Sequence, residues 1–325
     1  SPYVDREKER MKRVILAPHM KCNAHCSHCC VSSHPKDERR LADTDVQRLV
    51  DEAIAATDVE VISFTGGEAL LRPAFILDLI RRVSRAGKRT TLVSNGFWGV
   101  TPKAARQQLT ELQDAGLCVL TLSTDAFHAP YVPVRRIKNI LGARCCAPNI
   151  KVLLNMVESK SHRADEVLTE LGSSVEGIRI TRISITPAGA AATLPSDEIE
   201  YCATSVDRLR CPGQTLLFSG NDQTYPCCSI GVINSALSVG RASKLTVEEA
   251  ARRIERNLMF HIISREGFRW IVEELKAQGI DKYQSPFPVV DACHLCCEIF
   301  SNHEHVALLR PALLRYRQEY LASRS

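Results

Sequence analysis

The 325-residue chain has 45% hydrophobic and 24% charged residues with ordinary amounts of glycine and proline, which excludes a disordered or fibrous protein and indicates a globular one. A net charge of +5 is too small to indicate a nucleic-acid partner, and no apolar run reaches the 18 residues of a membrane span. The polar N-terminal segment SPYVDREKERMK lacks the apolar core of a signal peptide, so we expect a cytoplasmic protein with no membrane partner.

The first two-thirds of the chain alternate short β-rich runs with amphipathic stretches, a pattern typical of a parallel α/β sheet. Six strands are predicted, over Val14–Ala17, Val59–Phe64, Thr90–Ser94, Val119–Ser123, Lys151–Val157 and Ile178–Ile185. Helices are predicted over Ala42–Ala56, over Pro73–Ala86, and from the N-cap Thr101 and Pro102 to Gly116. Six such units predict a partial (β/α)6 barrel of the TIM type, not the closed eight-stranded one.

After about residue 195 the sequence becomes polar, turn-rich and cysteine-rich. Helices are predicted from Thr246, over Phe268–Gln278, and as a tail from about Val306. We therefore expect a barrel domain over residues 12–195, a cysteine-rich extension over 196–305 and a C-terminal helical tail over 306–325.

The chain has 14 cysteines, and a reducing compartment disfavours disulfides, so clustered thiols indicate metal ligands. The clustered cysteines are Cys22, Cys26, Cys29 and Cys30, then Cys145 and Cys146, then Cys211, Cys227 and Cys228, then Cys293, Cys296 and Cys297. Cys118 and Cys202 stand alone and are interpreted as buried small apolar residues.

Cys22, Cys26 and Cys29 form a CxxxCxxC loop directly after the first predicted strand, at the end of a barrel where active sites are built. Three thiolates leave one iron of a four-iron cluster open. That iron can chelate the amino and carboxylate groups of S-adenosylmethionine (SAM). An electron passed into bound SAM would then yield methionine and a 5′-deoxyadenosyl radical.

On spacing alone, the same loop could hold a structural zinc ion, with His25, His28 or Cys30 as the fourth ligand. Polar groups that end three further predicted strands favour the SAM interpretation, because strand ends of a barrel converge on one mouth. These groups are Gly66-Gly67-Glu68, Ser94-Asn95, and Ser123 with Asp125.

Together, the CxxxCxxC loop, the GGE motif and the strand-end polar residues resemble the radical SAM superfamily. The resemblance implies that the three cysteines of the loop bind a [4Fe–4S] cluster. It implies that Gly66, Gly67 and Glu68 hold the SAM amino group. It also implies that Ser94 and Asn95 lie near the ribose and that Ser123 lies close to the methionyl end.

Four further cysteines, Cys211, Cys227, Cys293 and Cys296, could complete a second metal site with no open position. In a chain that already binds one iron–sulfur cluster, we expect a second [4Fe–4S] cluster, and a structural zinc site is the alternative. The arrangement resembles the auxiliary-cluster (twitch or SPASM-like) extension of radical SAM enzymes. The extra thiol of Cys297 leaves open whether Cys296 is the fourth ligand.

The tandem pair Cys227-Cys228 suggests a role for a thiol that binds no metal. Successive side chains of an extended segment face opposite ways, so one cysteine can bind the cluster while the other points away. A thiol S–H bond is weak enough to give a hydrogen atom to a carbon radical, which would produce epimerisation. The alternative is a spare buried cysteine.

Several segments resemble the YydG-type radical SAM peptidyl epimerases. They are CNAHCSHCCVSSHP, VISFTGGEALL, LVSNGFWG, DAFHAPYV followed by KNIL, CPGQTLLF with TYPCCS, NLMFHIISREGFRW and CHLC. The resemblance implies conversion of L- to D-residues in a ribosomally made peptide, with two [4Fe–4S] clusters and Cys228 as hydrogen donor. It also implies that SAM is consumed and that a flavodoxin- or ferredoxin-like protein supplies electrons. An epimerase of a sugar-containing antibiotic, and a maturase that forms thioether or carbon–carbon crosslinks, remain alternatives.

Overall fold

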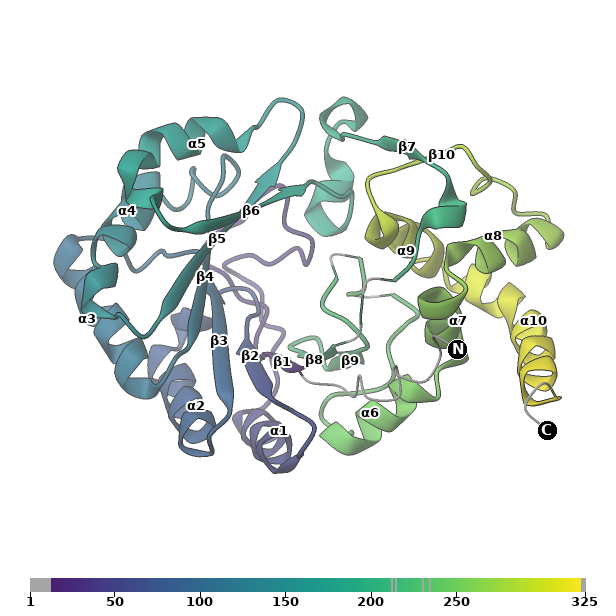
Figure 1. Cartoon of the computed structure of the whole chain (residues 1–325), viewed down its shortest axis with the longest axis horizontal. Helices are drawn as coiled ribbons and strands as arrows, with labels where there is room; N and C mark the ends of the chain where they lie inside the picture. Colours follow the sequence, from purple (N-terminus) through teal and green to yellow (C-terminus); the bar gives the residue numbers. More distant parts are fainter. Residues whose placement is uncertain (1–12, 212, 214, 230, 234, 323–325) are drawn as a thin grey trace.

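The computed structural model describes residues 13–322 apart from 212, 214, 230 and 234. Within these residues, the main sheet has eight strands in the order β6-β5-β4-β3-β2-β1-β8-β9 (Figure 1). The first six are β1 (Arg13–Ala17), β2 (Val61–Phe64), β3 (Arg89–Ser94), β4 (Val119–Ser123), β5 (Lys151–Glu158) and β6 (Arg179–Ser184). Each runs parallel to the next, and β6 forms an edge of the sheet. The predicted α/β class with six parallel strands is confirmed.

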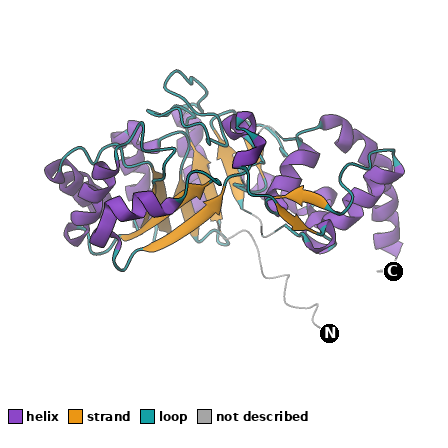
Figure 2. Cartoon of the chain, turned by 90° about the horizontal axis from the view of Figure 1, so that it is seen from above, coloured by secondary structure: helices purple, strands orange, loops and turns teal. Residues whose placement is uncertain are grey.

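Five helices connect these strands and cover one face of the sheet (Figures 1 and 2). They are α1 (Asp43–Ala55), α2 (Pro73–Arg85), α3 (Pro102–Ala115), α4 (Val134–Gly142) and α5 (Ala164–Leu171). The ends of α3 follow from its sequence. The Thr101 side chain accepts a hydrogen bond from Ala104 N, and Gly116 closes the helix with a φ of 94°, which favours glycine.

Two strands that the sequence did not predict join the extension to the barrel. β8 (Leu216–Ser219) pairs parallel with β1, and β9 (Gln223–Tyr225) pairs antiparallel with β8. All four residues of β8 are buried, because this strand continues the main sheet beside β1. A run of three apolar residues, Leu216, Leu217 and Phe218, within turn-rich sequence has no periodicity to reveal a strand. The predicted domain boundaries near residues 195 and 305 stay predictions. Residue 12, the predicted start of the barrel domain, lies outside the described residues.

The rest of the extension is mainly helical. Its helices are α6 (Val247–Glu255), α7 (Leu258–Arg265), α8 (Phe268–Ala277), α9 (Ala292–Phe300) and α10 (His303–Ala322), and β10 (Phe287–Val289) pairs antiparallel with β7 (Cys202–Thr204). Short 3-10 helices lie over Ala69–Leu71, Arg144–Cys146, Gly172–Val175, Gly189–Thr193, Ser196–Glu198 and Val206–Arg208. Thr246 caps α6 as predicted, and the terminal helix begins at His303, three residues before the expected start.

One hydrophobic core extends from Val14 of β1 to Leu309 of α10, so the barrel and the extension share buried contacts. Cys118 is only partly buried, which corrects its interpretation as a buried residue, and its thiol lies 3.8 Å from Gly116 O. The side chain of Cys202 lies outside the described ones. Among the described helices, none has both the length and the apolar composition that crossing a membrane requires.

The position of β8 predicts the effect of truncating Phe218, which is fully buried beside Leu16 of β1. Phe218→Ala should lower the free energy of unfolding by about 3–5 kcal/mol, because it removes buried contacts and leaves a cavity. Chemical denaturation under anaerobic conditions measures this. Leu314→Ala on the exposed side of α10 should change it by less than about 0.5 kcal/mol. Equal effects of the two substitutions would contradict the assignment of β8 to the core.

Candidate functional site

The CxxxCxxC loop follows β1 and brings its three thiols together. Cys22 and Cys26 are buried, with 9% and 6% of their surface exposed, and Cys29 packs against them. A hydrogen bond from Cys29 N to Cys26 O, of 3.1 Å, closes the loop into a turn. Burial, with smaller contributions from Glu68 and Cys29, raises the pKa of Cys22 to about 11.

Polar groups of the chain already point at these sulfur atoms. Ala24 N lies 3.4 Å from Cys22 Sγ, Ser33 N lies 3.4 Å from Cys29 Sγ, and Asn95 Nδ2 lies 3.7 Å from Cys22 Sγ. Hydrogen bonds to sulfur stabilise thiolate ligands and tune iron–sulfur clusters. Three converging thiols with such donors therefore suit a cluster with one open iron.

The GGE motif after β2 packs directly on this loop. Gly67 N donates to His19 O at 3.0 Å, and Glu68 N donates to Lys21 O at 2.9 Å. A Cβ atom on Gly66 would overlap the carbonyl of His19, and one on Gly67 would overlap that of Lys21. The glycines therefore leave room for the backbone of the cysteine loop, and their contact with the SAM amino group stays a prediction.

Glu68 is buried beneath the loop with 1% of its surface exposed, and it connects the GGE motif to the end of β3. Its carboxylate accepts hydrogen bonds from Leu70 N (3.0 Å), Ser94 Oγ (3.0 Å) and Asn95 N (2.7 Å). Burial raises the pKa of Glu68 to about 7, although these hydrogen bonds oppose the shift. A bound ammonium group would favour the charged carboxylate, as expected for a residue that holds the amino group of SAM.

Ser94 and Asn95 lie at the carboxyl end of β3, as predicted, and both form hydrogen bonds with other residues of the chain. Ser94 Oγ also accepts from Gly96 N and Trp98 Nε1, each at 3.1 Å. Asn95 Nδ2 donates to Asn23 Oδ1 of the cysteine loop at 2.9 Å. The ribose contacts of Ser94 and Asn95 stay predictions. Ser123 ends β4 opposite Asn155 and is half-buried, and its contact with the methionyl end likewise stays a prediction.

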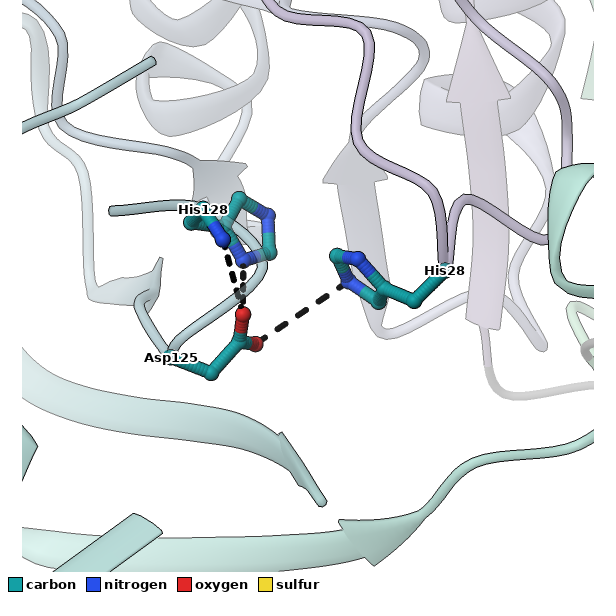
Figure 3. A group of neighbouring side chains, drawn as sticks. All are labelled: His28, Asp125 and His128. Carbon is teal, nitrogen blue, oxygen red and sulfur yellow. Dashed lines mark hydrogen bonds and ion pairs between the residues drawn. The ribbon is translucent and has the colours of Figure 1, made fainter. Parts of the chain in front are cut away.

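His28 from the cysteine loop meets Asp125 and His128 from the loop after β4 (Figure 3). Asp125 Oδ1 lies 2.9 Å from His128 Nδ1, and Asp125 Oδ2 lies 3.9 Å from His28 Nε2. Asp125 also accepts from the backbone N–H groups of Phe127, His128 and Val157. Burial opposes ionisation of Asp125, but the hydrogen bond from His128 and the nearby histidines outweigh it and lower its pKa. The trio thus places His28 of the cysteine loop beside the loop that follows β4.

The sequence had offered His28 only as a zinc ligand and had left His128 without a role. Their relevance could have been inferred from position, because His28 lies within CxxxCxxC and His128 follows a strand-end aspartate by three residues. Burial lowers the pKa of His28 to about 4, with a smaller contribution from His128, so its imidazole is neutral near pH 7.

The extension brings together the four cysteines expected to form a second site. Cys211 N donates to Ile263 O at 3.1 Å, Cys227 follows β9, and Cys293 and Cys296 lie one turn apart at the start of α9. Burial, followed by the nearby thiols of Cys211, Cys228 and Cys293, raises the pKa of Cys227 to about 12. Burial together with Cys227, Cys211, Cys293 and Cys297 raises the pKa of Cys296 as well. Cys211, Cys227 and Cys296 also pack against the same hydrophobic core, and the binding of a cluster by the four thiols stays a prediction.

Cys297 differs from Cys296 in its surroundings. Its Sγ lies 3.6 Å from Ser301 Oγ, and a Cβ atom placed on Gly231 would lie 3.0 Å from the same Sγ. Burial raises the pKa of Cys297, and the charge of the adjacent Glu298 raises it further. The geometry therefore favours Cys296 as the partner of Cys211, Cys227 and Cys293.

Cys228 is exposed, whereas the adjacent Cys227 is half-buried and packs against the core. Burial and the neighbouring Cys29 raise the pKa of Cys30 to about 12, and Cys228 adds to this shift. Cys228 also contributes to the raised pKa of Cys293, after burial and Asp291. The pKa values of Cys30 and Cys293 thus both respond to the Cys228 thiol, and its role as hydrogen donor stays a prediction.

Comparison with known proteins identifies the family of the chain. Residues 17–144 match the model of the radical SAM superfamily. The chain is 32% identical over 312 residues to the "Putative peptide biosynthesis protein YydG" of Bacillus subtilis (strain 168), which covers 95% of this chain and 98% of that protein. It is also 34% identical over 113 residues to a GTP 3′,8-cyclase of Synechococcus elongatus, covering 33% and 32% of the two chains.

Two solved structures share the fold at low sequence identity. The structure of native anSMEcpe with bound AdoMet and Cp18Cys peptide has a TM-score of 0.55 at 12% identity, and covers 95% of this chain and 99% of that chain. SuiB of Streptococcus suis bound to S-adenosylmethionine has a TM-score of 0.53 at 14% identity, and covers 79% of this chain and 68% of that chain. At such identities the likeness concerns the fold alone.

The contact between the GGE motif and the cysteine loop predicts the effect of Gly67→Ala. The added methyl group would push against the Lys21 carbonyl and displace the loop, so the protein should lose about four iron atoms per chain, the content of one four-iron cluster. Iron analysis after anaerobic reconstitution measures this. Gly142→Ala, at a helix end with open space around it, should keep the full iron content. Full iron content in Gly67→Ala would contradict the packing argument.

Proposed function

Because the chain belongs to the radical SAM superfamily, we propose that it is a radical SAM epimerase that converts L-residues to D-residues in a ribosomally made peptide. The family implies SAM and a [4Fe–4S] cluster as cofactors. The observation that carries the epimerase proposal is the exposed thiol of Cys228 beside the half-buried Cys227. A donor thiol must be accessible to substrate, whereas a cluster ligand need not be.

The cysteines of the CxxxCxxC loop bind the first cluster, and the polar groups after β2 to β4 bind SAM. Cys22, Cys26 and Cys29 are the cluster ligands, Gly66, Gly67 and Glu68 hold the amino group, and Ser94, Asn95 and Ser123 lie near the ribose and methionyl end. When bound, the cluster and SAM together supply the 5′-deoxyadenosyl radical that removes a hydrogen atom from the substrate. Glu68 provides a buried carboxylate for the SAM ammonium group.

Cys228 completes the reaction by giving its thiol hydrogen to the opposite face of the substrate radical. The substrate regains one hydrogen atom and its original mass, and Cys228 is left as a thiyl radical. One electron and one proton then restore the thiol. A flavodoxin- or ferredoxin-like protein supplies this electron and the one that cleaves SAM. Each turnover consumes one SAM molecule, because the hydrogen taken from the substrate leaves with 5′-deoxyadenosine.

Cys211, Cys227, Cys293 and Cys296 bind a second [4Fe–4S] cluster in the extension. The packing of Cys211, Cys227 and Cys296 against one core supports this assignment, and so does α9, because a helix places Cys293 and Cys296 on one face. A cluster held by these four thiols would supply an electron carrier in the extension, from which the Cys228 thiyl radical could be reduced.

The peptide is favoured as substrate by the similarity to YydG, whose name refers to peptide biosynthesis and which matches almost the whole chain. A sugar-containing antibiotic as substrate would leave the roles of Cys228 and both clusters unchanged. A crosslinking maturase would remove two hydrogen atoms from its product and would need no donor thiol. The mass of the product therefore separates epimerisation from crosslinking.

The assignment of the second cluster predicts different effects for two adjacent cysteines. Cys296→Ala should lose about four of about eight iron atoms per chain, because it removes a ligand of one of two four-iron clusters. Cys297→Ala should retain all of them, since its thiol contacts Ser301. Anaerobic iron and sulfide analysis with Mössbauer spectroscopy measures the difference. The reverse pattern would make Cys297 the fourth ligand. Finding zinc in place of iron would contradict the second iron–sulfur cluster.

The donor role predicts the fate of hydrogen at the inverted carbon. In deuterated water the wild-type enzyme should add one deuterium to its peptide, because the Cys228 thiol exchanges with solvent. Cys228→Ala should form less than about 1% of the D-residue while still producing 5′-deoxyadenosine. Mass spectrometry and chiral amino-acid analysis measure both. Cys145→Ala, at another exposed thiol, serves as control and should behave like wild type. Inversion by Cys228→Ala at the wild-type rate would rule out this donor.

A further inference from the structure

A pocket of about 300 Å³ opens at the mouth of the barrel beside the CxxxCxxC loop. Its lining residues all follow the carboxyl ends of strands: Ser27 after β1, Ala126, Phe127 and Pro130 after β4, His162 after β5, and Leu194, Pro195 and Glu198 after β6. Ser27 lies between the proposed cluster ligands Cys26 and Cys29. The pocket is therefore next to the proposed source of the radical, although none of the residues assigned above to SAM lines it.

The walls of the pocket are mainly apolar and are held in place. Phe127 is 7% exposed and packs on one side with Ile185 and Ile199. Its ring stacks on His28 at 5.0 Å between centroids and lies 4.8 Å from the ring of His162. Leu194 packs against the same cluster. Phe127 thus presents a fixed apolar surface next to the cysteine loop.

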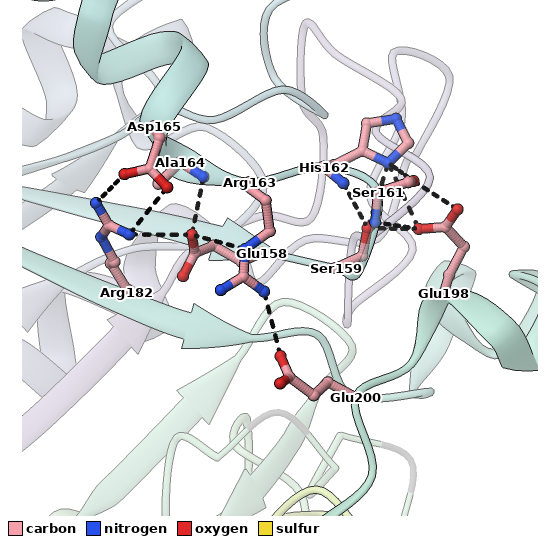
Figure 4. A network of polar contacts seen from close by, with 10 residues as sticks. All are labelled: Glu158, Ser159, Ser161, His162, Arg163, Ala164, Asp165, Arg182, Glu198 and Glu200. Atoms are coloured by element: carbon pink, nitrogen blue, oxygen red, sulfur yellow. Dashed lines mark hydrogen bonds and ion pairs between the residues drawn. The ribbon is translucent and has the colours of Figure 1, made fainter.

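The polar side of the pocket is built by Glu198 (Figure 4). Ser159 Oγ and Ser161 Oγ each donate to its carboxylate at 2.5 Å, and Lys160 N donates to its backbone carbonyl at 3.0 Å. Hydrogen bonds from the two hydroxyl groups hold the pKa of Glu198 near 2. The carboxylate is therefore engaged in joining the loop after β5 to the segment after β6.

Nearby ion pairs hold the same two segments together. Arg163 lies 3.2 Å from Glu200, and Arg182 of β6 lies 3.5 Å from Glu158 at the end of β5 (Figure 4). A pocket whose walls are fixed by such contacts can select its occupant by shape.

We propose that this pocket binds an apolar side chain of the peptide substrate, at a residue that flanks the one whose hydrogen is removed. The inference rests on the proposed peptide epimerase function. Five of the eight lining residues are apolar, and the single carboxylate already has two hydroxyl partners. A volume at the lower end of the range for ligand pockets suits one or two side chains and not a multi-ring sugar antibiotic.

The test uses a library of randomised synthetic nonapeptides in deuterated water with SAM and a chemical reductant. Tandem mass spectrometry identifies the peptides that gain one deuterium and the residues beside the labelled one. In the wild type, Leu, Ile, Val, Met or Phe at one flanking position should be enriched about 10- to 100-fold over Gly, as expected from burying one such side chain. Enrichment of Lys or Arg there would overturn the proposal, since Glu198 would then be recognising a cation.

Two substitutions of Leu194 give the proposal a specific signature. Leu194→Trp should fill the pocket and shift the flanking preference to Gly and Ala, and Leu194→Ala should enlarge it and shift the preference to Phe and Trp. Both should still cleave SAM to 5′-deoxyadenosine. Leu314→Trp, on the exposed side of α10, should keep the wild-type preference.

The outcomes separate this proposal from the function on which it rests. Deuteration with the same flanking preference in all variants would overturn the pocket assignment and leave peptide epimerisation intact. SAM cleavage by the wild type with no deuterated peptide in the library would overturn both.

Discussion

The backbone hydrogen bonds from Gly67 N to His19 O and from Glu68 N to Lys21 O join the end of β2 to the loop after β1. These bonds can form only if positions 66 and 67 are glycines, because a Cβ atom on either would overlap the loop. With the loop held in this way, Glu68 is buried beneath it and Asn95 reaches both Asn23 and Cys22. The positions of the three thiols and of the proposed SAM site depend on this contact.

The same loop organises what lies on either side of it. Toward β4, His28 contacts Asp125 and stacks on Phe127, which forms the apolar wall of the proposed substrate pocket. Toward the extension, the Cys228 thiol contributes to the raised pKa values of Cys30 and of Cys293 in α9. β8 joins the extension to the barrel, because it continues the main sheet beside β1, and Cys227 follows its partner strand β9. The loop after β1 thus adjoins the proposed substrate pocket on one side, and β8 links the barrel to the extension on the other.

Much of the barrel followed from the sequence because its signals are local. Strand periodicity and the helix ends at Thr101 and Gly116 depend on residues that are close in the chain. The CxxxCxxC spacing likewise places three thiols within one short loop. The extension was harder, because the four residues of β8 form a strand only through pairing with β1, and CHLC gave no sign of lying within α9. The pocket could not be predicted, since Phe127, Leu194 and Glu198 come from separate loops and meet only in the folded chain. The choice between Cys296 and Cys297 as fourth ligand likewise stays a prediction, because spacing alone allows either.

The central claim is that a radical generated at the barrel loop ends on the thiol of Cys228. Electron paramagnetic resonance of Cys228→Ala, frozen during turnover with a peptide that the wild type deuterates, tests it most directly. We predict that a carbon-centred radical accumulates on the peptide in this variant and not in the wild type, because no thiol returns the hydrogen atom. A variant that accumulates no such radical and still forms the D-residue would contradict the account.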